Sequence, residues 1–432
     1  MNISDNTVMA QVIAAALIFL IVYHHLGYPL MLKALSTLRL RSARRSTIAS
    51  RNFRNCVGDR RVPKVHLYIP AYNEEAYIYQ KLTSLSWLDY PKDKLKITVL
   101  CDGCSDQTAA RARSALTEFS LSELDIQVVE YPENRGKIAM VNEAIQQCDA
   151  DIMAFSDVSA VLAADCFWRM AHHFMCHPNV GVVTGHYSVI KATMKPGDAS
   201  NSDGSSSDGS SSDETSNEQA YWNYQNQIRA MEGSLGAVMG APGAFYAIRH
   251  HLCQPLEFDT INDDFILPMR GVAQGFNALF DPELQIFETE PSDMEMDAQR
   301  RIRISQGNMQ QILRLKRLLL PDLGWASWMF TSGKFLRVLM PYCMLAVLLL
   351  SAWLAPHHWF WALTYLLQIA VYVLAAAYYL TNAQAHNSGL QRLLNHKVVR
   401  LVSYLCIGHF MGLIGSAKYL LNTLMNKKQQ PW

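Results

Sequence analysis

Two short apolar runs in this chain each stop at an aspartate, and this pattern restricts the possible folds more than any other feature. The first run covers residues 97–101 and ends at Asp102, and the second covers residues 152–155 and is followed by Asp157. Short apolar runs bounded by polar turns are typical of strands buried in a parallel sheet. Because ligands bind beyond the carboxyl ends of such strands, we expect both aspartates to line a crevice.

Strand-like runs alternate with helix-like stretches over residues 62–195. The expected strands cover residues 65–69, 95–101, 126–131, 152–155 and 180–184, and the expected helices cover residues 74–88, 108–118, 137–148 and 165–176. Later segments add helical spacing at residues 221–235 and 265–272 and a strand-like run at residues 278–280. The alternation predicts an α/β fold with a doubly wound, mostly parallel sheet, in one domain over residues 62–320.

A segment rich in serine, aspartate and glycine interrupts this domain at residues 196–218. It has no apolar residue beyond Ala199, so it cannot bury enough surface to fold, and we expect a disordered surface loop. A weak calcium site is the alternative, which the lack of a loop-closing glutamate disfavours.

Four apolar segments indicate a membrane protein. Charged residues make up only 17% of the chain, which is low for a soluble protein. One apolar segment lies near the N-terminus, and three more cover residues 335–354, 359–380 and 401–424, each close to the length that crosses a bilayer. We expect a transmembrane anchor at residues 1–33 and a membrane region at residues 321–432 with about three transmembrane α-helices.

A basic stretch at residues 34–61 follows the first apolar segment. It contains eight arginines and one acid, Asp59. Basic residues after the apolar run disfavour a cleavable signal peptide. A nucleic-acid patch is the other alternative, but a cytoplasmic juxtamembrane segment fits the position better, and the net charge of +1 gives no general preference for nucleic acid. We therefore expect a multi-pass protein of the cell (inner) membrane with its α/β domain in the cytoplasm.

The nine cysteines show no repeated pairs. Cys101 and Cys104 form one C-x-x-C, but a zinc site usually needs a second pair. Reduced thiols in a cytosolic domain are the simpler interpretation.

The polar groups at the expected strand ends are suited to a nucleotide and a cation. Asp102 could accept hydrogen bonds from a base and ribose, and Asp157 could provide a hard oxygen ligand for a divalent cation that bridges two phosphates. Structural roles remain open, because an aspartate before glycine favours a turn and the Asn-Glu pair at residues 73–74 favours a helix start. The pairing makes a nucleotide-sugar enzyme the leading hypothesis.

Six short motifs follow one another along the expected domain. They are Pro-Ala-Tyr-Asn-Glu-Glu at residues 70–75, Asp-Gly-Cys-Ser-Asp at 102–106, Asn-Arg-Gly-Lys at 134–137 followed by Asn142, Asp-Val-Ser at 157–159, Gly-Ala-Pro-Gly-Ala at 240–244 and Asn-Asp-Asp at 262–264. In their order and spacing these motifs resemble those of family 2 glycosyltransferases, and the chain resembles the membrane-bound branch of that family across residues 65–305. The resemblance implies the GT-A fold of nucleotide-diphospho-sugar transferases, a nucleoside-diphosphate sugar donor, and Mg²⁺ or Mn²⁺.

The resemblance also implies roles for individual residues. Asp264 corresponds to the general base that takes the proton of an attacking sugar hydroxyl, and Asp263 could share this role. Asp157 would bind the cation with Ser159, which replaces the second carboxylate of the family motif. The implied donor-binding residues are Pro70, Ala71, Asn73, Glu74, Asp102, Lys137, Asp157, Arg300, Arg301 and Arg303, and the implied acceptor-side residues are Gly240, Ala241 and Gly243.

Plain structural alternatives stay open for several of these residues. Two acids before an apolar helical run also stabilise a helix N-terminus, and a lysine after glycine is often a solvated helix start. The three arginines could neutralise a leaving diphosphate or face anionic lipid.

The segment Gln299-Arg-Arg-Ile-Arg303 departs from the Q-x-x-R-W motif of processive relatives, since no tryptophan follows Arg303. This departure disfavours polymer synthesis. We therefore expect an inverting glycosyltransferase of polysaccharide biosynthesis, which moves one sugar to a lipid-linked or membrane-associated glycan alongside other polysaccharide-assembly proteins. A processive synthase coupled to export and a non-catalytic membrane scaffold of an assembly complex are the alternatives.

Overall fold

The computed structural model describes residues 3–43, 62–117, 121, 123–189, 209–288, 294–381 and 396–425. The chain forms two compact units. The first unit contains Met1–Met31, Asp293–Arg314 and Phe330–Lys428, and the second contains Leu32–Ser292, Leu315–Met329 and Gln429–Trp432. The candidate membrane helices contribute most of the first unit, and an α/β sheet forms the centre of the second.

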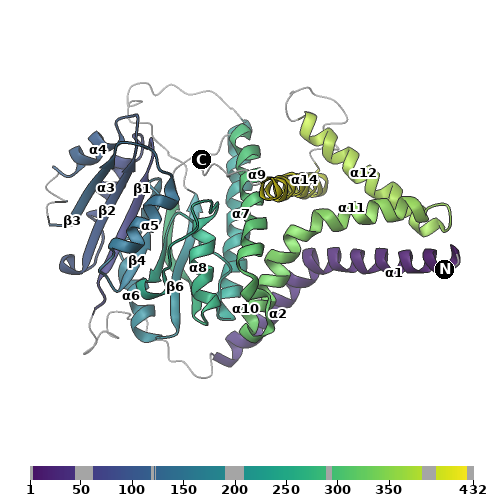
Figure 1. Ribbon diagram of the computed structural model, residues 1–432, viewed down its shortest axis with the longest axis horizontal. Helices are drawn as coiled ribbons and strands as arrows, with labels where there is room; N and C mark the ends of the chain where they lie inside the picture. The colour runs from purple at the N-terminus through teal and green to yellow at the C-terminus, as the bar shows by residue number, and fades with distance from the viewer. Residues whose placement is uncertain are drawn as a thin grey trace. The chain divides into compact units, whose positions relative to one another are not determined.

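The second unit is built on one eight-stranded mixed sheet with the order β3-β2-β1-β4-β7-β6-β8-β5 (Figure 1). The strands are β1 (Val65–Ala71), β2 (Leu95–Asp102), β3 (Asp125–Tyr131), β4 (Ile152–Phe155), β5 (Ala160–Leu162), β6 (Val180–Val189), β7 (Tyr246–Arg249) and β8 (Asn277–Glu288). β3, β2, β1 and β4 are mutually parallel, β7 is antiparallel to both of its neighbours, and β6 pairs in parallel with β8. The predicted mostly parallel sheet is confirmed.

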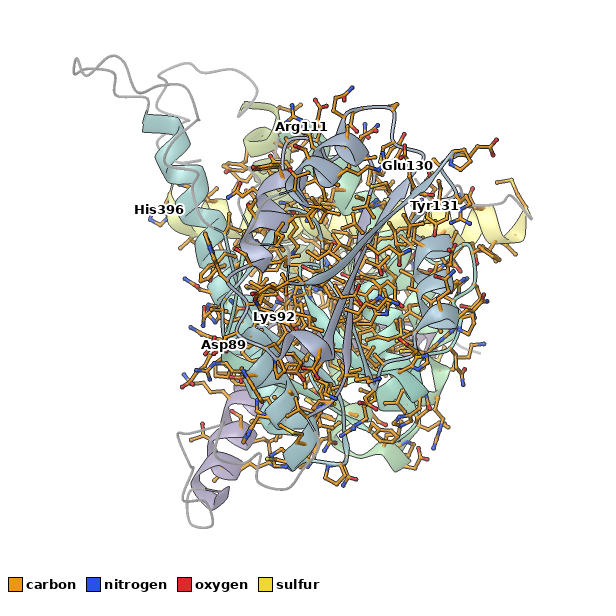
Figure 2. The ribbon with its side chains drawn as sticks, turned by 90° about the vertical axis from the view of Figure 1, so that its left-hand side faces the viewer. Asp89, Lys92, Arg111, Glu130, Tyr131 and His396 are labelled. Atoms are coloured by element: carbon orange, nitrogen blue, oxygen red, sulfur yellow. The ribbon has the colours of Figure 1, made fainter. Side chains whose placement is uncertain are left out.

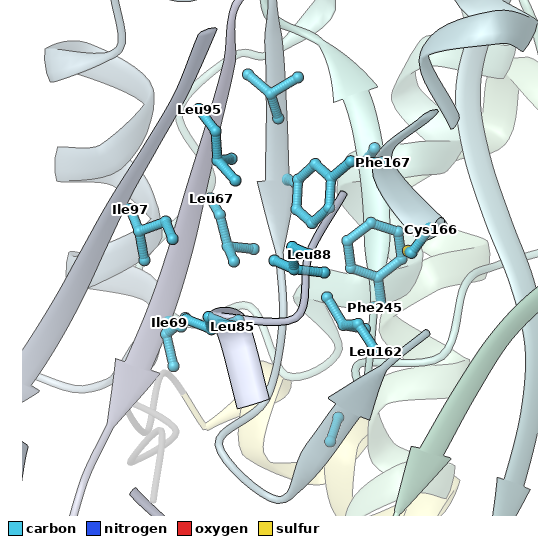
Figure 3. Close-up of a cluster of buried hydrophobic side chains, with 14 of the residues drawn as sticks. Leu67, Ile69, Leu85, Leu88, Leu95, Ile97, Leu162, Cys166, Phe167 and Phe245 are labelled. Carbon is cyan, nitrogen blue, oxygen red and sulfur yellow. The ribbon is translucent and has the colours of Figure 1, made fainter. Parts of the chain in front are cut away.

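Helices cover both faces of this sheet, which explains why its central strands are apolar on both sides. Leu67 of β1 packs with side chains of α3 (Ile78–Leu85), α4 (Thr108–Ala115) and α6 (Cys166–Cys176) in the main core (Figure 3). On the opposite face, α5 (Lys137–Gln147) contacts β1 and β2, while α8 (Asp263–Ala273) contacts β6, β7 and β8. Tyr68 also lies on that face and stacks on Phe155.

Two expectations for this unit need correction. Helix α7 spans Gly209–Ser234, so the expected disordered segment 196–218 is wrong from residue 209 onward, while residues 196–208 lie outside the described part of the chain. The C-terminal part of α7 packs on β6 and β8. A helix anchored by packing propagates cheaply into neighbouring residues, even polar ones. The strand expected at residues 278–280 is the start of the longer β8.

The first unit is a helical assembly. It contains α1 (Ile3–Val22), the π-helical turn η1 (Tyr23–Gly27), α9 (Met294–Arg314), the π-helical turn η8 (Phe330–Phe335), α11 (Leu336–Leu354), α12 (Trp359–Thr381) and α14 (Lys397–Leu424). α1 packs against α11, and α14 packs against α9 and α12. Polar contacts join the helices, including Tyr342 Oη to Ser416 Oγ at 2.8 Å and His25 Nε2 to His409 Nε2 at 2.9 Å.

Four helices in the described part of the chain are long and apolar enough to cross a membrane. They span Asn6–Arg39, Trp325–Leu354, Trp359–Leu380 and Val398–Leu424. Length and apolar composition of this kind are what a bilayer span requires. The chain is therefore suited to association with a membrane.

Candidate active site

The polar motifs meet at one place because of the strand order. β1 has β2 on one side and β4 on the other, so the sheet grows first to one side of β1 and then to the other. In parallel sheets, such a switch point opens a crevice beyond the carboxyl ends of the strands. Pro70 and Ala71 end β1, and Asp157 follows β4 at the same edge.

The segment after β1 is fastened to the segment after β2. Asn73 has a left-handed backbone with a φ of 55°, and its Oδ1 accepts a hydrogen bond from the Ser105 amide at 2.9 Å. The Glu74 amide donates to Thr108 Oγ1 at 2.7 Å. Asn73 and Glu74, the predicted donor-binding residues, therefore hold the segment after β1 against the segment after β2.

Asp102 organises the next loop. Its carboxylate is almost fully buried and accepts hydrogen bonds from the backbone amides of Arg135 at 3.1 Å and Gly136 at 2.7 Å. Gly103 allows this approach, because its φ is +61° and a Cβ there would lie 2.2 Å from the backbone nitrogen of Asn134. The aspartate thus shapes the turn that immediately precedes Lys137.

A stacked arginine lies beside this turn, at the end of the edge strand β3. The guanidinium carbon of Arg135 is 3.8 Å from the ring centroid of Tyr131, which is labelled in Figure 2. Glu143 accepts hydrogen bonds from both side chains, with Arg135 Nη2 at 2.9 Å. The guanidinium therefore lies over an aromatic ring and is hydrogen-bonded to the same glutamate as that ring's hydroxyl, which restricts its orientation.

Lys137 is the centre of the acidic cluster. Its Nζ lies 3.2 Å from Asp157 Oδ1 and 3.5 Å from Asp263 Oδ2. Burial alone would lower the pKa of Lys137, but the negative charges of Asp157, Asp263 and Asp264 outweigh it and raise the pKa. Lys137 therefore remains a cation and holds together carboxylates that would otherwise repel one another.

Asp264 has the electrostatic character of a general base. Burial and the adjacent charge of Asp263 raise its pKa to about 7, although Lys137 draws it down. A carboxylate that titrates near neutral pH can accept a proton far better than an ordinary exposed aspartate. Asp263 and Asp264 also open helix α8, so the catalytic and the helix-stabilising interpretations are compatible.

The glycine-containing segment 240–244 lies against these carboxylates. A Cβ at Gly243 would be 2.8 Å from Asp157 Oδ2 and 3.5 Å from Asp264 Oδ2. Gly240 has a φ of +91°, and a Cβ there would be 2.4 Å from a ring carbon of Phe265. The Ala241 amide donates to the Asp264 carbonyl at 3.3 Å. Only a residue without a side chain leaves the two carboxylates uncovered at position 243.

Ser159, expected beside Asp157 as a cation ligand, makes a different contact. Its Oγ donates to Glu288 Oε1 at 2.7 Å, and the Tyr187 hydroxyl donates to Glu288 Oε2. The serine therefore connects the Asp157 loop to the end of β8. Glu288 was not identified from the sequence, because it belongs to none of the six motifs.

Lys81 and Tyr246 were also missed. Lys81 lies on the core-facing side of α3 with an exposed fraction of 1%, and its Nζ donates to Ser156 Oγ at 2.6 Å. The buried Tyr246 hydroxyl has no hydrogen-bond partner among the described residues, and burial, followed by the charges of Asp263 and Asp264, raises its pKa. A lysine among the apolar positions of a helix was the only sequence signal for either residue.

The carboxylates fit a divalent cation that is shared with a ligand. Among the described residues, no three His, Cys, Asp or Glu side chains form a complete metal site. The Asp157 side chain is 39% exposed, whereas the buried Asp263 Oδ2 has Lys137 Nζ as its ion-pair partner at 3.5 Å and accepts no hydrogen bond in the described part of the chain. Carboxylate oxygens suit Mg²⁺ and Mn²⁺, which usually keep waters and bind substrate phosphates. Asp157 would be the principal protein ligand.

The three predicted arginines lie on α9, which belongs to the helical unit. The guanidinium carbon of Arg301 is 4.7 Å from the ring centroid of Tyr404 on α14, while Arg300 and Arg303 are exposed. Within the sheet unit the structure brings together Lys137, Asp157, Asp263, Asp264 and Gly243.

Comparisons with known proteins show the family and the fold of this chain. The model of the family described as "Glycosyltransferase like family 2" matches residues 63–307. The probable glycosyltransferase YdaM of Bacillus subtilis is 24% identical over 258 residues, which are 59% of this chain and 57% of that protein. The poly-beta-1,6-N-acetyl-D-glucosamine synthase of Staphylococcus aureus is 22% identical over 249 residues, 57% of this chain and 55% of that protein. The chain thus spans little more than half the length of these relatives.

One solved structure has a similar fold. The mannosyltransferase PcManGT from Pyrobaculum calidifontis, in complex with GDP-Man and Mn²⁺, aligns with a TM-score of 0.62 at 20% identity and covers 94% of this chain and 99% of that chain. A likeness at this identity concerns the fold. The predicted GT-A fold is confirmed, together with the long apolar helices that accompany the sheet.

Proposed function

Because the chain belongs to the glycosyltransferase-like family 2, we propose that it moves a sugar from a nucleoside-diphosphate sugar to a lipid-linked or membrane-associated glycan, with inversion at the anomeric carbon. The observation that carries this proposal is the convergence of Asp157, Asp263 and Asp264 around Lys137. Asp264, whose pKa is near neutral, stands next to the exposed carboxylate of Asp157. That pairing suits a single displacement with one base.

In the proposed reaction, the acceptor hydroxyl oxygen bonds to the anomeric carbon while the bond from that carbon to the diphosphate breaks. Asp264 takes the hydroxyl proton, and Asp263 supports it through the shared Lys137. The Lys137 cation contributes positive charge toward the departing diphosphate. A bound Mg²⁺ or Mn²⁺ at Asp157 would add further charge neutralisation. Asp102 keeps the Lys137 turn in its working conformation through the amides of residues 135 and 136.

The donor is a nucleotide sugar in this proposal, and its base and sugar are left open. The structure of PcManGT, which has a similar fold, contains GDP-Man, and the relatives include synthases of a polymer of N-acetylglucosamine. The stacked Arg135 and Tyr131 pair lies beside the Asp102 turn and is suited to contact the base. Arg300, Arg301 and Arg303 on α9 are proposed as donor contacts, with lipid contact as the alternative.

The proposed location is the cell (inner) membrane, with the sheet unit in the cytoplasm. Four apolar helices support membrane association, and the basic residues 34–61 favour the cytoplasmic side for the segment after the first helix. This location suits a transferase whose donor is a soluble nucleotide sugar and whose acceptor is held by the membrane.

A processive synthase is the second candidate function. It is favoured by the relatives named poly-beta-1,6-N-acetyl-D-glucosamine synthase. The absence of tryptophan after Arg303 in the sequence favours single transfer. The length of the product on a gel separates the two, because a synthase yields a ladder and a single transferase yields one product.

The test uses the full chain in detergent or nanodiscs, with a panel of nucleotide sugars and Mn²⁺. The D264N variant should lower kcat by about 100-fold or more while donor binding persists. D93N changes an exposed aspartate next to Lys94 and serves as the matched control. Full activity of folded D264N would contradict the base assignment. Failure of the wild type to bind or hydrolyse any nucleotide sugar would favour the scaffold alternative.

A further inference from the structure

One buried lysine takes no part in the reaction described above. Lys81 is 1% exposed, on the core side of α3 between Ile78 and Leu82. None of the ion pairs found among the described residues includes it. Burying a lysine in an apolar core is costly unless its amine is well hydrogen-bonded, so its contacts indicate what it is for.

The Lys81 amine bridges the two sides of the Asp157 turn. It donates to Ser156 Oγ at 2.6 Å and to the carbonyl oxygen of Ala160. The Ala160 amide in turn donates to the Asp157 carbonyl at 3.3 Å. Both contacts therefore fall on residues that flank Asp157 within a single tight turn.

The same contacts reach the glycine segment on the other side of the carboxylates. The Ser156 hydroxyl donates to the Ala244 carbonyl at 2.7 Å, so its lone pair is available to accept from Lys81. Ala244 follows Gly243, whose missing side chain leaves room for Asp157 Oδ2. A chain of hydrogen bonds thus runs from α3 through Ser156 to the segment that faces Asp157.

The charges around Lys81 also connect it to Asp157. Burial lowers the pKa of Lys81 to about 7, and the charge of Asp157 is the strongest influence that opposes this change. Asp157 is therefore the carboxylate that most affects Lys81, although the two side chains form no ion pair among the described residues. Ser159, where the family motif has a second carboxylate, bonds to Glu288 instead.

From this geometry we infer that Lys81 is a positioning residue, which fixes the Asp157 turn from the core so that one carboxylate suffices to hold a divalent cation against a diphosphate. The inference rests on the proposed function of Asp157. Outer contacts of this kind orient a metal ligand and typically change metal affinity about 10- to 100-fold when removed.

The experiment measures Mn²⁺ binding by calorimetry in the full chain, in the presence of GDP and of UDP, together with kcat, KM for the donor and Tm. K81M keeps an unbranched side chain one heavy atom shorter than that of lysine and removes its hydrogen-bond donors. We expect its Kd for Mn²⁺ to rise about 10-fold or more, with kcat recovering at saturating Mn²⁺. K81R should restore part of the affinity. K92M, at an exposed lysine paired with Glu123, is the matched control and should bind Mn²⁺ as the wild type does.

Two further variants keep the outcome decisive. S156A retains Lys81 and removes one of its acceptors, so it should weaken Mn²⁺ binding less than K81M does, and it serves if K81M fails to fold. D157N tests the proposed function itself. If D157N loses Mn²⁺ binding while K81M binds Mn²⁺ as the wild type does and only has a lowered Tm, the inference about Lys81 is overturned and the proposed cation site stands. Unchanged binding in D157N would instead overturn the proposed cation site.

Discussion

The Nζ atom of Lys137 lies 3.2 Å from Asp157 Oδ1, and this pair joins the first residue of α5 to the carboxylate that follows β4. The two residues come from separate strand–helix units, which the parallel pairing of β1 with β2 and β4 brings to one edge. The same lysine reaches Asp263 at the start of α8. This one cation therefore balances acids contributed by two separate segments of the chain.

Removing the lysine should move the pH profile of the reaction. Lys137 lowers the pKa of Asp264, so K137M should raise that pKa further above 7. The rise of kcat/KM with pH should then shift upward by about one pH unit or more, since a close opposite charge has an effect of that size. Initial rates from pH 5.5 to 9 measure it, with K92M as the control. An unshifted profile with reduced activity would mean that Lys137 acts on the donor alone.

Replacing Asp264 should change stability in a pH-dependent way. Its folded pKa of about 7 exceeds its ordinary value of 3.8, so between these limits the folded state binds more protons than the unfolded state. The free energy of unfolding of the wild type therefore falls as the pH rises through this window. D264N lacks this loss, so its Tm relative to wild type should be higher at pH 8 than at pH 4.5. Thermal melts in detergent test this, and an equal difference at both pH values would contradict it.

Adding one methyl group at Gly243 should disturb the site. The Cβ of G243A would lie 2.8 Å from Asp157 Oδ2, so the carboxylate must move. A displacement of this kind costs roughly 100-fold in kcat/KM when it misaligns reacting groups. G271A is the matched control in the same unit, because its Cβ would meet nothing closer than 3.6 Å. Equal activities of the two variants would show that Asp157 tolerates the shift.

Restoring the second carboxylate of the family motif should destabilise this chain. Asp at position 159 would replace the hydroxyl that donates to Glu288 Oε1, and two carboxylates would then face each other. S159D should lower the Tm at pH 7, and the double variant S159D/E288Q should regain most of the loss, because an amide can donate to the new carboxylate. A double-mutant cycle of Tm values at one pH measures this coupling. Additive effects would contradict it.

Local sequence patterns predicted the strands and the strand-end acids well. β1, β2 and β4 begin at the expected residues, because an uninterrupted apolar run is a property of neighbouring residues. The motif order also singles out Lys137, Asp157 and Asp264, which the structure places close together. Helical spacing at residues 221–235 predicted the C-terminal part of α7, but not its polar N-terminal part from residue 209, which continues a helix that packs on β6 and β8.

Contacts between distant residues were not predictable in this way. Lys81 and Ser156 are 75 positions apart, and Ser159 and Glu288 are 129 positions apart. No periodicity within either segment indicates such a partner. The α9 arginines were expected in the catalytic domain, whereas α9 packs against α14 in the helical unit.

The sequence determined which residues end the strands, which segments are apolar enough for a membrane and which acids and lysine are present for chemistry. The folded arrangement decided which of those charges act on one another. The elevated pKa of Asp264 and the lowered pKa of Lys81 arise from burial and from carboxylates contributed by other segments. Charge interactions depend on distance and solvent access through space, and neither quantity is encoded in the spacing of residues along the chain.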